Sequence, residues 1–167
     1  QKMYDLCVIG SGWAGFNACL RATELGEKVA LIERDEIGGV CLNRGCIPTK
    51  TLVNSARIIR EIPHYRDFGI EVKDYAVHFD QIQTRKRKVI ADLQKGIQFQ
   101  LQRQKVEIIK GEAKILGVNE ISVNADPLKA KYIIIATGSK PAELPGLRFN
   151  QDNIISSNEI LALTSPP

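Results

Sequence analysis

The fold of this chain is constrained most by the stretch Gly-Ser-Gly-Trp-Ala-Gly at positions 10–15. An apolar run, Tyr4–Ile9, precedes it, and a helix-like segment, Phe16–Gly26, follows it. A second apolar run, Lys28–Ile32, ends in Glu33. The order strand, glycine turn, helix, strand and acid predicts a unit that binds a dinucleotide.

The three glycines of this unit have different expected tasks. Gly10 permits a tight turn, Gly12 lets the backbone approach a pyrophosphate, and Gly15 lets the helix pack closely on the strand. Peptide N–H groups at the helix start would hold the phosphates. Glu33, 23 residues after Gly10, would accept hydrogen bonds from a ribose. This unit alone leaves open which dinucleotide binds.

Composition narrows the class of protein. The chain has 167 residues, of which 44% are hydrophobic and 25% charged, and its net charge is +4. These values are ordinary for a globular domain, and no apolar run reaches the length of a membrane span. We therefore expect a cytoplasmic protein without a membrane partner. The basic run Arg85–Lys88 lies in a helix-like segment without interleaved aromatic residues, so a solvated helix face is favoured over a nucleic-acid site.

The positions of the four cysteines indicate what role each of them has. In a reducing compartment a cysteine pair is more often catalytic or metal-binding than structural. Cys7 and Cys19 lie in apolar segments and are expected to be small core residues. The cysteine spacing, with His64 and His78 far away in the sequence, does not match a zinc site, so no metal is predicted.

Cys41 and Cys46 lie in the stretch GGVCLNRGCIPTK. In a regular helix, residues five apart have Cα atoms about 8.7 Å apart. Since bridging needs about 7 Å or less, a disulfide requires a break in the helix, which Gly45 would permit. The helix-like stretch Thr49–Arg60 places Cys46 near a helix N-terminus, which favours the thiolate. A redox pair is predicted; two unconnected thiols in a loop are the alternative.

These motifs resemble those of the pyridine nucleotide–disulfide oxidoreductases. Within that family, the sequence motif Cys-Leu-Asn-x-Gly-Cys-Ile-Pro-Thr-Lys is most similar to that of the dihydrolipoamide dehydrogenases. Glutathione and mercuric reductases share the spacing of the two cysteines and remain alternatives, as does a non-catalytic nucleotide-binding fragment. The resemblance implies a flavoprotein oxidoreductase with FAD as cofactor, and NAD in the full-length enzyme. It also implies a lipoamide or lipoyl-domain dithiol as substrate, a homodimer for the full-length enzyme, and no nucleic acid.

The later segments fit the same resemblance. A long amphipathic segment, His78–Gln104, precedes short strand-like runs over 106–110, 113–116 and 121–123. A turn is expected at Asp126-Pro127, and a strand over Lys131–Ala136. The implied fold is α/β: a Rossmann-like FAD-binding domain with a parallel sheet, helices on its faces and a small antiparallel β-meander. It is incomplete relative to the full enzyme, with residues 1–150 as the FAD-binding domain and 151–167 as the start of a linker toward an absent NAD-binding domain.

The resemblance also assigns roles to individual residues. Cys41 would exchange with the dithiol, Cys46 would lie against the flavin, and Lys50 would lie near the reactive flavin nitrogen. These three are the expected catalytic residues. The expected FAD contacts are Gly10, Ser11, Gly12, Ala14, Gly15, Glu33, Arg34, Gly39, Val40, Cys41, Lys50, Ala113, Ala136, Thr137 and Gly138.

Overall fold

The computed structural model describes residues 2–150 and 152–166. The chain divides into two compact units. The first contains residues up to 43 together with 92–140, and the second contains 44–91 together with 141 onward. The long helix α4, Phe79–Arg103, contributes residues to both units.

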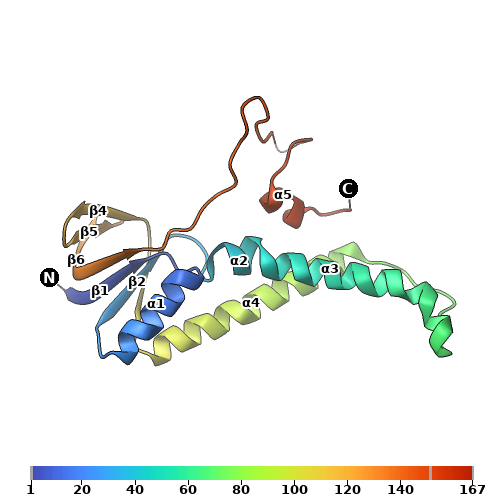
Figure 1. Ribbon diagram of the computed structural model, residues 1–167, viewed down its shortest axis with the longest axis horizontal. Coiled ribbons are helices and arrows are strands. Elements are labelled where there is room, and N and C mark those ends of the chain that lie inside the picture. The colour runs from blue at the N-terminus through green and yellow to red at the C-terminus, as the bar shows by residue number, and fades with distance from the viewer. Residues whose placement is uncertain (1, 151, 167) are drawn as a thin grey trace. The chain divides into compact units, whose positions relative to one another are not determined.

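One six-stranded sheet forms the centre of the first unit, in the order β3-β2-β1-β6-β5-β4 (Figure 1). Strands β3, β2, β1 and β6 pair in parallel, whereas β4, β5 and β6 pair as an antiparallel meander. The strands are β1 (Met3–Ile9), β2 (Val29–Glu33), β3 (Glu107–Lys110), β4 (Ala113–Gly117), β5 (Glu120–Val123) and β6 (Asp126–Ile135). This α/β architecture confirms the expected fold class.

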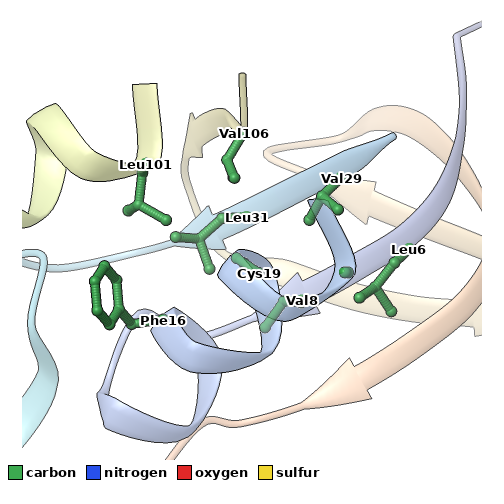
Figure 2. Close-up of a cluster of buried hydrophobic side chains, with 9 residues drawn as sticks. Leu6, Val8, Phe16, Cys19, Val29, Leu31, Leu101 and Val106 are labelled. Atoms are coloured by element: carbon green, nitrogen blue, oxygen red, sulfur yellow. The ribbon is translucent and has the colours of Figure 1, made fainter. Parts of the chain in front are cut away.

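Helix α1, Trp13–Glu24, and the end of α4 cover one face of the sheet. On α1 the buried side chains Phe16, Cys19 and Ala22 recur at helical spacing. They pack with Leu31 of β2 and with Leu101 of α4, both fully buried (Figure 2). Burial of a leucine or phenylalanine side chain stabilises the fold by about 1.5–3 kcal/mol. This cluster therefore fixes α1 directly behind the glycine turn.

The other sheet face is covered by the meander. Ile121 of β5 and Leu128 of β6 pack with Tyr4 and Cys7 of β1 and with Ile32 of β2. Both faces of β1 and β2 are thus buried, which explains why these two strands read as continuous apolar runs in the sequence.

The hairpin between β5 and β6 corrects one expectation. The turn lies at Asn124 and Ala125, which both have positive φ (51° and 76°), and not at Asp126-Pro127. Two positive-φ residues between paired strands are typical of a two-residue hairpin turn. Asp126 pairs with Val123, so β6 begins five residues before the expected strand start at Lys131.

The second unit contains α3 (Cys46–Glu61), the 3-10 helix η1 (Ile62–Phe68), the first part of α4, and α5 (Ser157–Ala162). On α4, the ammonium of Lys86 donates to the carbonyl of Leu161, and the Gln83 amide donates to that of Leu163 at 2.9 Å. Arg85, Arg87 and Lys88 are exposed, as a solvated face requires, but Lys86 is buried. The expectation of a solvated face is therefore wrong for Lys86, because this side chain caps the end of α5.

Within residues 2–150 and 152–166, no helix combines the length and apolarity needed to cross a membrane. Across those same residues, no three His, Cys, Asp or Glu side chains gather in a way that could hold a metal ion.

The remaining helix, α2 (Gly39–Arg44), lies in the first unit apart from its last residue and carries Cys41. It follows directly on the loop after β2, so its position depends on how that loop meets the glycine turn.

Candidate functional site

The glycine turn after β1 is closed by β6. Gly10 has φ of +102°, and a Cβ on it would lie 2.4 Å from the carbonyl oxygen of Ala136. Its N–H donates to the Ile32 carbonyl at 2.8 Å, and the Ala136 N–H donates to the Ile9 carbonyl at 2.8 Å. The turn therefore lies where β1, β2 and β6 all end. Ligands of open α/β sheets bind at such carboxyl ends.

The other two glycines of the turn differ in what surrounds them. A Cβ on Gly15 would lie 1.8 Å from the Gly10 carbonyl oxygen, so the close packing of α1 on β1 excludes any side chain. A Cβ on Gly12 would meet only Gly39 Cα, at 3.8 Å, which is an ordinary contact. Gly12 also has φ of −63°, which any residue can adopt. Among the described residues, nothing in the fold therefore requires glycine at position 12.

Glu33, at the end of β2, is buried beneath this turn. Its Oε2 accepts hydrogen bonds from the Ser11 N–H at 2.8 Å and from the Ser11 hydroxyl at 2.6 Å. Its Oε1 accepts from the Asp35 N–H at 2.8 Å. A carboxylate has about four acceptor positions, so Oε1 retains the capacity to accept from a ribose hydroxyl. The sequence pattern predicted the acid at this position but not its bonds to Ser11.

The loop after β2 lies directly on the glycine turn. Gly39 has φ of +64°, and a Cβ on it would lie 2.6 Å from Gly12 Cα. Gly38 has φ of +106°, and a Cβ there would lie 2.2 Å from Leu42 Cδ2. The Gly38 N–H donates to the Ser11 hydroxyl at 3.1 Å. Gly38 was not among the predicted site residues, although the Gly-Gly pair in the sequence was a signal for it.

Asn43 holds the other side of this loop. Its side-chain amide approaches the carbonyls of Glu36, Ile37 and Gly39 at 3.0–3.2 Å, and its Oδ1 accepts from the Gln94 amide at 2.8 Å. These contacts make Asn43 a residue that fixes the shape of this loop. Nothing in the helical pattern of α4 marked Gln94 as its partner.

The cysteines occupy two kinds of environment. Cys41 is half-buried on α2, and Cys46 is exposed at the first position of α3. Between these helices Gly45 has φ −141° and ψ −114°, so the helical path is interrupted where a break was expected. All four cysteines are thiols in this structure. Burial raises the pKa of the Cys7 and Cys19 thiols to about 12, which makes both unreactive near neutral pH.

The remaining predicted residues are distributed around this turn and beyond it. Ala14 and Val40 are exposed in the first turns of α1 and α2. Arg34 forms an exposed ion pair with Glu112 at 3.6 Å, and Ala113 begins β4. Thr137 and Gly138 are exposed after β6, Gly138 with φ of +68°. Cys46 and Lys50 belong to the second unit, where Lys50 is exposed on α3.

Comparison with known proteins identifies the family. A family model described as pyridine nucleotide-disulphide oxidoreductase matches residues 4–167. The chain is 40% identical to a dihydrolipoyl dehydrogenase of Chlorobaculum parvum, over 100% of this chain and 37% of that protein. It is 35% identical to a dihydrolipoyl dehydrogenase of Bacillus subtilis, over 98% of this chain and 37% of that protein. For a dihydrolipoyl dehydrogenase of Acholeplasma laidlawii the identity is 35%, over 100% of this chain and 51% of that protein.

The chain thus spans between about a third and a half of the length of these relatives. The matched residues include the glycine turn, the two-cysteine stretch and the meander. The chain belongs to the pyridine nucleotide-disulphide oxidoreductase family.

Proposed function

We propose that this chain is the FAD-binding part of a dihydrolipoyl dehydrogenase-like flavoprotein oxidoreductase. The observation that carries the proposal is Gly12. Gly10, Gly15 and Gly39 are glycines because the protein's own backbone leaves no room for a Cβ, whereas Gly12 has room for one. A glycine that the fold does not require fits a backbone that a pyrophosphate must approach closely.

The residues around Gly12 suit such a ligand. The first N–H groups of α1 lie beside it and would hold phosphate oxygens, while Glu33 Oε1 would accept from the adenosine ribose. Ala136, Thr137 and Gly138, which follow β6, lie along the same sheet edge and would border the cofactor. Ala14, Arg34, Val40, Lys50 and Ala113 remain proposed contacts on the strength of the family resemblance. By the same family resemblance, we propose that residues 1–150 form the FAD-binding domain and that residues 151–167 begin a linker.

The proposed chemistry is dithiol oxidation at Cys41 and Cys46. A substrate thiolate attacks the sulfur of Cys41 in a Cys41–Cys46 disulfide, and Cys46 departs as a thiolate. The second substrate thiol then attacks the mixed disulfide and releases Cys41, so the substrate leaves as a disulfide. Two electrons have then moved from the substrate to the cysteine pair; one substrate proton stays on Cys41, and the proton lost when the first substrate thiolate formed goes to solvent. When bound, FAD would accept these two electrons and pass them to NAD⁺ in the full-length enzyme.

The names of the relatives support lipoamide, or the dithiol of a lipoyl domain, as the substrate. A homodimer and a cytoplasmic location of the full-length enzyme belong to the same proposal. Lys50, an exposed lysine on α3, would stabilise negative charge on the cofactor.

A visible absorption spectrum tests this proposal. The purified chain is mixed with FAD, excess FAD is removed, and the spectrum is recorded before and after addition of two electron equivalents. We expect retained flavin and a long-wavelength absorption band after reduction. The band should be absent in Cys46→Ser and unchanged in Cys19→Ala, which alters a buried thiol remote from this chemistry. Wild-type protein that retains no flavin, and that forms no Cys41–Cys46 disulfide on mild oxidation, would contradict the proposal.

A further inference from the structure

We propose that Ser11 is a positioning residue whose hydroxyl couples Glu33 in the dinucleotide site to the segment that carries Cys41. For the identity of the ligand this inference rests on the proposed function. The coupling itself depends only on residues of the first unit and can be tested without a ligand.

The Ser11 side chain is almost fully buried, with 1% of its surface exposed. Its hydroxyl donates to Glu33 Oε2 at 2.6 Å and accepts from the Gly38 N–H at 3.1 Å. A hydroxyl can fill both roles at once, since it has one proton and two lone pairs. This single group therefore connects the acid at the end of β2 with the residue that precedes α2.

Gly38 transmits this connection to Cys41 because the beginning of α2 has little freedom. Leu42 packs where a Cβ of Gly38 would lie, and Gly39 packs on the backbone of Gly12. Cys41 follows Gly39 by two residues on the same short helix. A shift of the Gly38 peptide thus displaces the first turn of α2 and the half-buried thiol on it.

Glu33 provides the other end of the coupling. A ribose hydroxyl that donates to its carboxylate competes for negative charge with the Ser11 hydroxyl, so ligand binding changes the bond that holds Gly38. This coupling is reciprocal. The factor by which ligand binding changes the conformational equilibrium of the Gly38 segment is also the factor by which that segment changes ligand affinity. The Ser11 N–H also donates to Glu33, but it belongs to the backbone and remains when the hydroxyl is removed.

A double-mutant cycle with alkylation as the readout tests the coupling. Ser11→Ala, Glu33→Gln and the double variant are treated with iodoacetamide at pH 7.5 under reducing conditions, and the labelling rate of each cysteine is followed by peptide mass spectrometry. The buried Cys7 and Cys19 report on global unfolding in the same sample, because they label only if the core opens. Ser122→Ala, on β5, is the matched control for loss of a hydroxyl in the same unit.

We expect each single substitution to raise the Cys41 rate by about fivefold or more, while Cys7 and Cys19 stay unlabelled. In the Ser11→Ala background, Glu33→Gln should change the Cys41 rate by less than about twofold, because the connecting hydroxyl is gone. Effects that multiply in the double variant would overturn the proposal, as would an unchanged Cys41 rate in Ser11→Ala. Labelling of Cys7 and Cys19 together with Cys41 would also overturn the proposal, because Ser11 would then have a general structural role.

Addition of FAD gives a separate result. In wild-type protein FAD should slow Cys41 labelling, and in Ser11→Ala this effect should be several-fold smaller. If FAD leaves the wild-type rate unchanged and is not retained, the proposed function fails. The mutant cycle, measured without ligand, still decides the role of Ser11.

Discussion

At the residue scale, the three glycines of the turn after β1 separate into two that the fold requires and one that it does not. The sequence pattern alone treats Gly10, Gly12 and Gly15 as equal members of a motif. The structure distinguishes them by what a Cβ would meet: backbone atoms at 2.4 Å and 1.8 Å for Gly10 and Gly15, and open space up to 3.8 Å for Gly12. A motif therefore contains folding positions and binding positions, and substitution by alanine can separate them.

We predict that Gly12→Ala folds but does not bind FAD, whereas Gly15→Ala does not fold stably. Alanine at the N-cap position of α1 should lower the free energy of unfolding by about 1 kcal/mol at most. A Cβ at position 15 has no space beside the Gly10 carbonyl, so a loss of about 3 kcal/mol or more is expected. Urea unfolding measured without FAD, and equilibrium dialysis with FAD, check both parts. Unimpaired FAD binding by Gly12→Ala would contradict the assignment of position 12 to the ligand.

At the scale of elements, α2 is held by contacts of its own Asn43 with the preceding loop and with α4. The Asn43 amide approaches two carbonyls of the loop before α2 and that of Gly39 at the start of α2, and its Oδ1 accepts from Gln94 on α4, 51 positions away in the sequence. A short helix of six residues has little stability of its own, so contacts of this kind determine whether it forms.

The contribution of this contact can be measured. Gln94→Ala should lower the free energy of unfolding by about 1 kcal/mol, because Asn43 Oδ1 loses its donor. Asn43→Asp should cost more, about 2–3 kcal/mol, since it removes both amide protons and directs a negative charge at carbonyl oxygens. Hydrogen exchange should also increase at the amides of α2. Gln98→Ala, an exposed glutamine on the same helix, is the matched control, and an equal effect of Gln98→Ala and Gln94→Ala would refute this role.

The same elements show how far the sequence is informative. The strands β1 and β2, helix α1 and its end before Gly26 could be predicted, because apolar periodicity and glycine turns are local signals. The Asn43–Gln94 bond, the burial of Lys86 and the Ser11–Glu33 bond could not, because each joins residues whose neighbourhood exists only after folding. The turn at Asn124-Ala125 was misplaced by two residues because Pro127 is a strong turn signal, yet it can also occupy an early strand position.

At the scale of the whole molecule, the two buried thiols link stability to pH. Cys7 faces the meander side of the sheet, and Cys19 lies in the cluster beneath α1. Burial raises the pKa of both thiols from 9.0 to about 12. Their positions on opposite faces mean that both core layers must remain closed to keep these protons.

The sign of the effect follows from proton binding. Between pH 9 and 12 the unfolded chain releases these two protons while the folded chain keeps them. The unfolded state then binds fewer protons, so the free energy of unfolding falls as pH rises, by at most about 1.4 kcal/mol per pH unit for each thiol. This stabilisation is fully present below pH 9 and is lost as pH approaches 12.

We predict that Cys7→Ala/Cys19→Ala has a shallower loss of stability than wild-type protein over this alkaline range, even if it is less stable at pH 7 because of the smaller side chains. Urea unfolding at several pH values from 8 upward measures the difference in slope, in which the titration of lysines and tyrosines cancels. Parallel stability curves for the double alanine variant and wild-type protein would mean that water reaches these thiols in the folded state, and the core would then be more open than the packing of α1 and the meander implies.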